Sequence, residues 1–461
     1  MLLLSIIAYL LVTILIGYLA SRRVKTSGDF MLAGRSLPIM LSTAALFATW
    51  FGSETVFGAS SQFLEGGLYA VIEDPFGAAL CLLLFGLVYA RPLYRMNLLT
   101  LGDFFKVRYG KRTELIAAIF IAPSYLGYIA AQLVAMGLIL NVVTGMDTWI
   151  GVTISAFVVT FYTYTGGMWA ISITDFIQGI LIVVGLAALA WVMSDKAGGT
   201  MAVLGQMREA DLRFLPKVEF YEIVTWLAAW SVLGLGSIPS QDVFQRVMSS
   251  GSESTAIRSC FYAAGLYLTV AMLPLFISLC TKQLYPAQLD GDTQLTLPRM
   301  VLEHTGLGIQ VVFFGSLLSA IMSTTSSAIL APAAILSENI IKPMYGAKLG
   351  DDRLLMITRI SVLLFSLIAT VMACLRSNIY ELVGESSIVS LVSLFVPLTL
   401  GIYWTRATAA GAVAAMFTGI TAWVVFKFVD TGMPELVPAT LISLITQVVI
   451  SRWQSEKLST W

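Results

Sequence analysis

The chain has 461 residues, of which 58% are hydrophobic and 12% are charged, with a formal net charge of +0 and a mean hydropathy of +0.86. Soluble globular chains carry about twice that share of charged residues, so the composition excludes a soluble enzyme, a nucleic-acid-binding protein and a disordered scaffold. The apolar runs are continuous rather than alternating, which excludes a membrane β-barrel.

Histidine and cysteine usage narrows the chemistry further. The single histidine, His304, lies in a polar stretch, so histidine-based catalysis and multi-histidine metal centres are not expected. The four cysteines are scattered through apolar runs without a C-x-x-C pair, which is typical of small buried side chains rather than of a metal or disulfide framework.

Apolar runs separated by polar segments predict thirteen membrane-spanning helices. A span needs about 20 apolar residues, so thirteen would use about 260, close to the whole hydrophobic set. The predicted helices lie near residues 2–20, 37–65, 68–90, 113–143, 148–165, 171–193, 221–247, 255–282, 309–341, 355–376, 380–405, 408–428 and 435–452. The first run is expected to be a retained helix, because its basic residues follow it and no signal-peptide cleavage site is present.

The distribution of basic residues predicts the orientation of the chain, since cytoplasmic segments of membrane proteins are enriched in Lys and Arg. With the N-terminus outside, most of the 27 Lys and Arg residues fall on inside segments, including the stretch 91–112 and Arg246. The opposite orientation would invert this bias. We therefore expect a multi-pass protein of the cell (inner) membrane with the N-terminus outside, the C-terminus cytoplasmic, and long outside loops at 194–220 and 283–308.

Two of the predicted helices are interrupted by small and polar residues. The helix that begins near Leu37 contains ATWFGSETVFGASS (48–61), and the helix that begins near Tyr221 contains LGLGSIPSQDVFQR (233–246). Five helices separate the two starts, and because five is odd the second set runs with inverted topology. Unwound backbone is tolerated at membrane depth only where it is buried in protein or lines a cavity. A matched pair of interrupted helices therefore indicates a transporter's binding site near the membrane midplane.

Acidic residues inside membrane spans are costly, so each one is a candidate functional residue. Glu54 lies in the first break and Asp242 in the second, while Asp175 lies just inside a span that follows a Gly-Gly turn. Asp74, which precedes Pro75, is more typical of a helix-end cap near the membrane interface.

The strongest local pattern is the hydroxyl-rich run GSLLSAIMSTTSSAILAPA at 315–333. Four of its residues have the spacing i, i+3, i+4, i+7 and share one helix face: Ala320, Ser323, Thr324 and Ser327. Bonding of hydroxyls to carbonyls one turn back, or close helix packing, explains an isolated pair more readily than a whole run. A hard cation such as Na⁺ prefers several oxygen ligands, which this face supplies.

These motifs resemble the sodium:solute symporter family. The likeness spans roughly residues 37–405, and its specific parts are the Ser/Thr-rich helix, the TGG…TD…Q stretch at 165–178 and the FATWFGSE break at 47–54. The resemblance implies an all-α polytopic membrane protein of about 13 transmembrane helices, with two inverted five-helix repeats that form a LeuT-like core. The corresponding segments would be an N-terminal helix and cytoplasmic loop (1–36), the first inverted repeat (37–193), an outside loop (194–220), the second inverted repeat (221–405), and two C-terminal helices with a short cytoplasmic tail (406–461).

The same resemblance implies sodium ligands at specific positions. A first Na⁺ site would use three backbone carbonyls and two hydroxyls, from Ala48, Phe51, Ala320, Ser323 and Thr324. A second Na⁺ site, present in some members, would use Asp175, Ser326 and Ser327. We expect one or two co-transported sodium ions and no organic cofactor.

Within the family, the sequence is most similar to the high-affinity choline transporter branch, through ATW (48–50), YGKR (109–112) and IPSQDVFQRVMSS (238–250). That branch is thought to hold a quaternary ammonium in an aromatic cage. Trp50 and Tyr128 match cage positions, whereas Ser240 stands where the choline branch has tryptophan and Glu54 stands where it has glycine. One wall of the cage is therefore missing.

These observations predict a sodium-coupled secondary transporter that takes up a small polar solute with a cationic or zwitterionic group by alternating access. The predicted solute-binding residues are Trp50, Glu54, Tyr128, Ser240 and Asp242. A proton-coupled symporter of the same fold, in which Asp175 and Glu54 titrate, and a choline-type transporter remain alternatives. The expected partners are the solute and the lipid bilayer, with no nucleic acid and no obligate protein partner. An enzyme or a channel is disfavoured, because no catalytic constellation or continuous polar pore is present.

Overall fold

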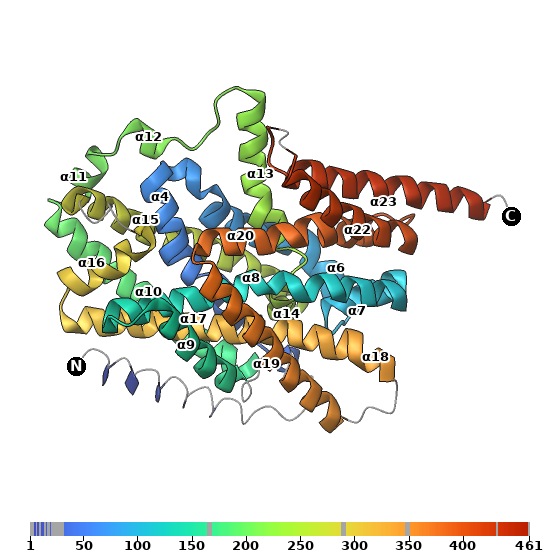
Figure 1. Cartoon of the computed structure of the whole chain (residues 1–461), viewed down its shortest axis with the longest axis horizontal. Helices are drawn as coiled ribbons and strands as arrows, with labels where there is room; N and C mark the ends of the chain where they lie inside the picture. The colour runs from blue at the N-terminus through green and yellow to red at the C-terminus, as the bar shows by residue number, and fades with distance from the viewer. Residues whose placement is uncertain are drawn as a thin grey trace.

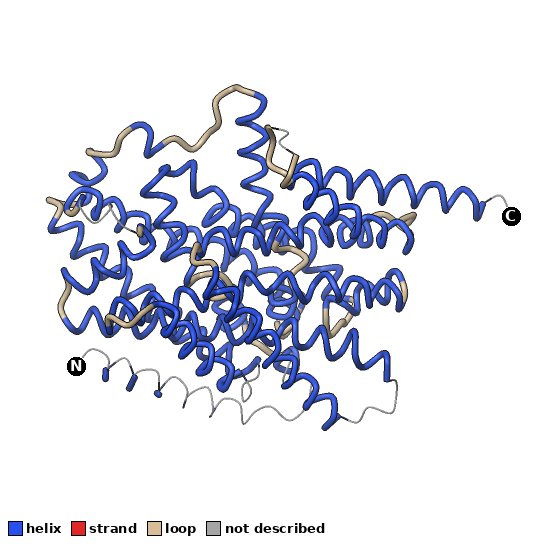
Figure 2. Tube along the Cα trace, viewed as in Figure 1, coloured by secondary structure: helices blue, strands red, loops and turns tan. Residues whose placement is uncertain are grey.

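The computed structural model describes residues 32–163, 168–286, 292–345, 351–429 and 432–459, with a few positions among the first 31. Regular structure in these ranges is helical (Figures 1 and 2). The N-terminal half contains η1 (Ala33–Arg35), α3 (Ile39–Phe47), η2 (Glu54–Gly58), α4 (Ala59–Gly66), η3 (Gly67–Val71), η4 (Ile72–Gly77), α5 (Ala78–Leu84), η5 (Phe85–Tyr89), α6 (Ala90–Arg95), α7 (Leu101–Tyr109), α8 (Lys111–Thr144), α9 (Thr148–Thr163), α10 (Met168–Lys196), α11 (Thr200–Gly205) and α12 (Glu209–Leu212).

The C-terminal half begins at the second interrupted helix and continues to the end of the described chain. It contains α13 (Phe220–Gly236), α14 (Gln241–Met248), α15 (Glu253–Leu284), η7 (Thr293–Leu295), α16 (Thr296–His304), α17 (Leu307–Ile335), η8 (Leu336–Ile341), α18 (Lys342–Tyr345), α19 (Asp351–Leu375), α20 (Ile379–Ser390), η10 (Leu391–Phe395), α21 (Val396–Tyr403), α22 (Ala409–Phe426) and α23 (Leu436–Ser459). The η segments are short stretches of 3₁₀ or π-helix.

Among the described residues, nine helices are long and apolar enough to cross a membrane, and up to ten if the bent pair α13–α14 is one span. The prediction of about 13 spans differs for identifiable reasons. The helical stretch Glu54–Arg95 is continuous, so it joins the second part of the predicted span 37–65 to the predicted span 68–90. The apolar part of α9 is shorter than a full span. The predicted first helix at 2–20 lies largely outside the described residues, as does the Gly-Gly turn before Asp175. The inverted relation of the two halves stays a prediction.

Both predicted breaks are present. Helix α3 ends at Phe47, irregular turns follow, and the helix resumes as the π-helical segment η2 and then α4. Helix α13 ends at Gly236, and α14 departs from its direction by 52°. Pro239 lies in this second break and cannot donate a backbone hydrogen bond, which favours an interruption there.

Helix α17, which carries the hydroxyl-rich run, is enclosed by protein. It packs against α8, α9, α10 and α19, and every residue from Phe313 to Ile335 is buried. Its hydroxyl groups therefore face other helices rather than lipid, as the sequence pattern predicts for a functional face.

The segment 194–220, which the sequence predicts to be an outside loop, folds back onto the C-terminal end of α4. Gly67 has a φ of +66°, and a Cβ atom there would lie 2.8 Å from the Asp211 Cα, so only glycine allows this approach. Hydrogen bonds from Arg208 and Lys282 hold the pKa of Asp211 well below its usual range. The loop is thereby fastened to α15 beside the first interrupted helix.

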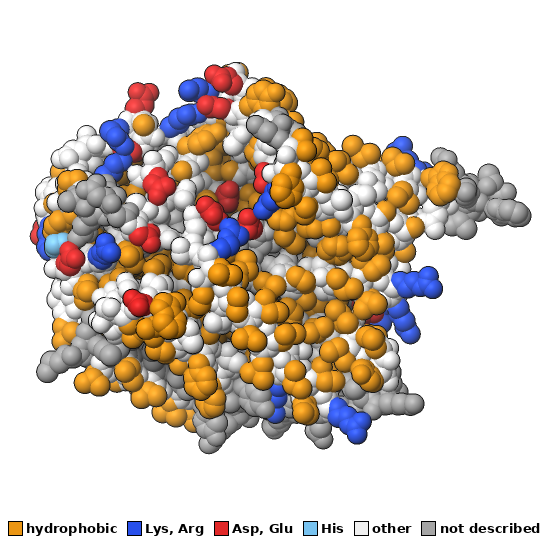
Figure 3. Space-filling view, in the orientation of Figure 1, with side chains coloured by type: hydrophobic (Ala, Val, Ile, Leu, Met, Phe, Trp, Pro, Cys, Tyr) orange, Lys and Arg blue, Asp and Glu red, His pale blue; other side chains and the backbone are white. Residues whose placement is uncertain are grey.

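Figure 3 shows a broad hydrophobic surface across the middle of the displayed face. Acidic and basic side chains gather at the top, over α12 and the stretch that leads to α13, and basic side chains project at the right near α7 (Figures 1 and 3). An apolar belt between charged ends is the surface expected of a protein that crosses a bilayer.

Close backbone packing of α22 on η10 gives a stability prediction. A Cβ at Gly419 would lie 1.8 Å from the Val392 carbonyl oxygen, whereas nothing lies within 4 Å of the Cβ position at Gly265 in α15. We expect Gly419→Ala to destabilise the protein by about 1–3 kcal/mol through overpacking, and Gly265→Ala to be neutral or slightly stabilising. Thermal unfolding in detergent measures both; equal melting temperatures for the two variants would contradict this packing.

Candidate functional site

A polar cavity lies where the two helix breaks meet α8 and α20, and its volume is about 30 Å³. Its lining residues are Trp50, Ser124, Tyr125, Tyr128, Ser237, Ser240, Asp242, Val383, Ser386, Ser387 and Ser390. A space of this size holds a water molecule or two, whereas solute sites usually exceed about 300 Å³. Helices or side chains around it must therefore move before an organic solute can enter.

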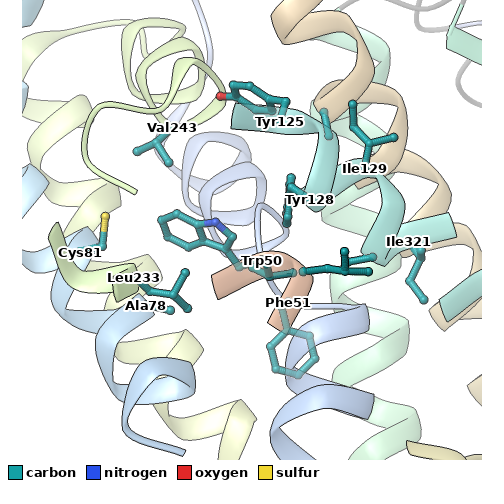
Figure 4. Close-up of a cluster of buried hydrophobic side chains, with 14 of the residues drawn as sticks. Trp50, Phe51, Ala78, Cys81, Tyr125, Tyr128, Ile129, Leu233, Val243 and Ile321 are labelled. Atoms are coloured by element: carbon teal, nitrogen blue, oxygen red, sulfur yellow. The ribbon is translucent and has the colours of Figure 1, made fainter. Parts of the chain in front are cut away.

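Aromatic side chains form one wall of this cavity. Trp50, from the first break, lies close to Tyr128 of α8, and Tyr125 lies one turn away on the same helix (Figure 4). Trp50 is only 4% exposed, and the Tyr128 hydroxyl donates to the Thr49 carbonyl. The cavity thus brings together the two predicted cage positions and ties one of them to the unwound backbone.

The second break contributes the acidic group of the cavity. Asp242 lies in the first turn of α14, where the helix dipole favours negative charge. The Tyr125 hydroxyl donates to the Asp242 Oδ1 at 2.8 Å and accepts from the Asp242 backbone N–H at 2.9 Å. The Ser240 hydroxyl donates to the Ser237 carbonyl, which leaves the space beside it open. The structure therefore places both predicted residues of this break at the cavity.

Glu54 is buried, with 1% of its surface exposed, in the π-helical segment that follows the first break. It is not among the described residues that line the cavity. A direct contact of Glu54 with solute, which the sequence predicts, therefore stays a prediction.

The hydroxyl face of α17 meets the first break. Thr324 Oγ1 donates a hydrogen bond of 2.9 Å to the Ala48 carbonyl, which is at the end of α3. The side chain of Ile321, one turn earlier on α17, lies so close to Gly52 that a Cβ atom added there would be 3.5 Å away. Helix α17 therefore packs against the first break. Phe51 and Ala320, the other residues of the predicted first sodium site, are buried at the same two segments.

Asp175 of α10 lies on another side of the same hydroxyl face. It is 1% exposed, and its Oδ1 accepts a 2.8 Å hydrogen bond from Ser323, a residue that the resemblance assigns to the first sodium site. Ser326 and Ser327 are buried on the same helix, and the Ser327 hydroxyl donates to the Ser323 carbonyl. Ser323 of the predicted first sodium site thus contacts Asp175 of the predicted second site, so the two sets of residues are adjacent.

Arg246 is a further charged residue of this region. The distribution of basic residues assigns it to an inside segment, and the structure buries it in α14 at 2% exposure, with a nitrogen 3.9 Å from the Asp175 Oδ2. A buried cation near a carboxylate reduces the net negative charge that sodium would meet. The short apolar sequence around Arg246 is the one signal that could have indicated its burial.

Two further groups that line the cavity were not identified from sequence. Tyr125 precedes Tyr128 by three residues and so lies on the same face of α8, which could have been read from spacing. Ser386, Ser387 and Ser390 come from α20, whose approach to both breaks depends on the tertiary fold.

Two interrupted helices meet at a polar cavity, and the buried hydroxyl-bearing helix α17 contacts the first of the breaks; this arrangement is the one expected of a membrane transporter. Residues 30–419 match the model of the sodium:solute symporter family. The chain belongs to the sodium:solute symporter family, and it is accordingly a transporter rather than an enzyme.

Curated relatives cover nearly the whole chain. The human high affinity choline transporter 1 is 29% identical over 95% of this chain and 78% of its own length. The sodium/proline symporter of Staphylococcus aureus is 27% identical over 97% of this chain and 91% of its own length.

Solved structures share the fold. A Na⁺-coupled sialic acid symporter, in a substrate-bound outward-open state, superposes with a TM-score of 0.84 at 19% identity and covers 98% of this chain and 97% of its own. Mhp1, a nucleobase-cation-symport-1 family transporter, gives a TM-score of 0.63 at 15% identity over 94% of this chain and 96% of its own.

The double hydrogen bond between Tyr125 and Asp242 gives a second prediction. Tyr125→Phe removes a donor and an acceptor from a buried carboxylate and its backbone N–H, which we expect to destabilise the protein by about 1–3 kcal/mol per unsatisfied group. Tyr262→Phe is the control, because Tyr262 is 58% exposed on α15. Thermal unfolding of both variants tests this; a Tyr125→Phe melting temperature equal to that of the wild type would show that Asp242 does not depend on the phenol.

Proposed function

We propose that the chain is a secondary active transporter that couples the inward movement of Na⁺ to the uptake of a small polar solute by alternating access. The observation that supports this most directly is the contact between Thr324 and the Ala48 carbonyl. It brings neutral oxygen ligands of α17 to the unwound backbone of the first break, as a sodium site between two moving groups of helices requires.

In the proposed first sodium site, two of the oxygens that would bind the ion now hydrogen-bond to each other: the Thr324 hydroxyl donates to the Ala48 carbonyl. Rotation of the Thr324 O–H away from this carbonyl would free lone pairs on both oxygens for a cation. The carbonyls of Phe51 and Ala320 and the Ser323 hydroxyl complete the set. Because α3 and α17 each supply ligands, sodium binding would hold the two helices together and favour one state of the access cycle.

The second proposed sodium site, with Asp175, Ser326 and Ser327, differs in its electrostatics. Asp175 already lies 3.9 Å from Arg246 and accepts a hydrogen bond from Ser323. A sodium ion there shares the carboxylate with the guanidinium, so we expect weaker binding than at the first site.

Ion number decides how far the solute can be concentrated. Moving one charge across about 100 mV yields about 2.3 kcal/mol, and a tenfold sodium gradient adds about 1.4 kcal/mol. One ion therefore supports roughly 500-fold accumulation of a neutral solute, and two ions support on the order of 10⁵-fold.

The proposed solute carries a cationic or zwitterionic group. Trp50 and Tyr128 offer aromatic faces that attract a cation, and Asp242 supplies a buried carboxylate at the same cavity. Two relatives, named for choline and for proline, transport molecules with a positively charged nitrogen. Ser240 leaves one side of the cavity without an aromatic wall, so the proposed solute is not restricted to choline and carries polar groups that the serines of α20 can bind; a choline-type transporter is the alternative.

We further propose that the protein lies in the cell (inner) membrane, with its N-terminus outside and its C-terminus in the cytoplasm. Basic side chains near α7 project at one end of the molecule (Figure 3), which supports a cytoplasmic position for that end.

Sodium binding at the first site can be tested without a known solute. A ligand that binds only the folded protein raises its melting temperature. We expect Thr324→Val to raise the sodium concentration needed for half-maximal stabilisation about tenfold or more, since each tenfold change corresponds to about 1.4 kcal/mol. Thr325→Val is the matched control, because the neighbouring Thr325 hydroxyl bonds to the Ile321 carbonyl of its own helix.

Melting temperatures measured against NaCl and against the same concentration of KCl separate sodium binding from ionic strength. Repeating the titration with a panel of amines, betaines and amino acids identifies the solute class through sodium-dependent stabilisation. If sodium and potassium act alike on the wild type, the sodium-coupled mechanism is wrong.

Asp175 tests the number of ions. We expect Asp175→Asn to express and fold, because asparagine still accepts from Ser323, but to reduce the cooperativity of sodium stabilisation from two ions toward one. Equilibrium binding of radioactive sodium to purified protein measures this directly. Unchanged sodium activation in Asp175→Asn would remove Asp175 from the site.

A further inference from the structure

Two buried carboxyl groups come from contacting segments, η2 and η4, of the helical hairpin that follows the first break. Glu54 belongs to η2 and is 1% exposed, and Asp74 belongs to η4 and is 0% exposed. Neither lines the polar cavity described above. Asp74 was expected to cap a helix end near the interface, but the structure places it in the protein interior.

The groups around this pair are acidic or phenolic. The principal charges that act on Glu54 are those of Asp74 and Glu73, both on η4. The titratable groups that face the pair from the packed helices are Tyr267 of α15, Tyr380 of α20 and Tyr128 of α8. The positive charge of Arg246, on α14, also acts on Tyr128. The carboxylate that Arg246 pairs with is Asp175.

Hydrogen bonds fix the proton arrangement on one side of the pair. Tyr267 donates to the Asp74 Oδ1 at 2.6 Å, and Thr55 Oγ1 lies 2.6 Å from the same phenol oxygen. A phenol has one proton, so Thr55 must donate to Tyr267 when Tyr267 donates to Asp74. One further oxygen of each carboxyl group, Glu54 Oε2 and Asp74 Oδ2, is buried and has no hydrogen-bond partner among the described residues.

Two ionised carboxylates cannot remain in this environment unaided. Burying an unpaired charge costs several kcal/mol, and a second like charge nearby adds to that cost, so paired carboxyl groups typically share one proton. A proton also supplies the missing donor, because a protonated carboxyl group has an O–H that a neighbouring oxygen accepts. A metal ion would instead need several oxygen ligands around it, whereas much of this surrounding is aromatic.

We propose that Glu54 and Asp74 form a proton-binding site, which holds one exchangeable proton within the pair. When Asp74 carries the proton, its O–H donates to the Tyr267 oxygen, and the Tyr267 O–H then donates to Thr55. The hydrogen bonds among Thr55, Tyr267 and Asp74 can therefore run in either direction. The site uses none of the residues assigned to sodium. Solute uptake should therefore weaken as pH rises, when loss of the shared proton leaves two buried negative charges next to the first break.

Infrared difference spectroscopy of the purified, full-length protein tests the site without sodium or solute. Spectra recorded between about pH 5 and about pH 9, where isolated carboxyl groups in water are already largely ionised, should show the C=O band of a protonated buried carboxyl group that shifts in D₂O. We expect this band to be lost in both Glu54→Gln and Asp74→Asn. It should persist in Asp175→Asn and Asp242→Asn, the matched controls.

Each outcome bears on the proposal. Absence of a protonated carboxyl band in the wild type at every pH overturns it, even if a variant fails to fold. A band that disappears in Asp175→Asn but persists in Glu54→Gln also overturns it and moves the proton to the proposed second sodium site. Loss of one bound radioactive sodium ion in Glu54→Gln, with no protonated band in the wild type, would make the pair a metal site instead. Because none of these measurements requires sodium-coupled transport, failure of the proposed function leaves the test intact.

Discussion

The structure depends on the unsatisfied backbone of two interrupted helices, because hydrocarbon offers no hydrogen bonds to exposed carbonyl and N–H groups. At the first break, carbonyls of Ala48 and Thr49 are met by hydroxyls of Thr324 and Tyr128. At the second break, the Asp242 N–H is met by Tyr125. Helices α8 and α17 therefore complete the breaks, and the same oxygen atoms that stabilise the fold are suitable ligands for a small cation and a polar solute.

Buried charges in this protein are balanced in two different ways. Asp175 lies beside a fixed internal cation, Arg246, whereas Glu54 and Asp74 face other acids and phenols. A neighbouring arginine suits an acidic group that stays ionised. Buried acidic groups without such a neighbour require a cation that can bind and leave, such as a proton. The region around α17 and the hairpin after the first break are thus different electrostatic environments, although both lie next to the first break.

Membership of the sodium:solute symporter family accounts for the fold but leaves solute recognition to this chain's own side chains. The relatives named for choline and for proline are each less than one third identical to it. Ser240, the serines of α20 and Asp242 give the cavity a more polar lining than an aromatic cage would have. Family and fold are thus compatible with several solutes, and under the proposed function the cavity lining would select among them.

Sequence by itself determined the membrane-spanning character of the chain, the two breaks and the hydroxyl face of α17, because each follows from residue types within a single segment, although the predicted number of spans was larger than the number found among the described residues. The family resemblance added Trp50 and Tyr128 as candidate cage positions, and the structure brings both to the cavity between the breaks. Only the tertiary structure decided which buried groups pair: Asp242 with Tyr125, Asp175 with Arg246, and Asp74 with Tyr267. These partners come from helices far apart in the chain, and local pattern carries no information about which distant side chain will satisfy a buried charge.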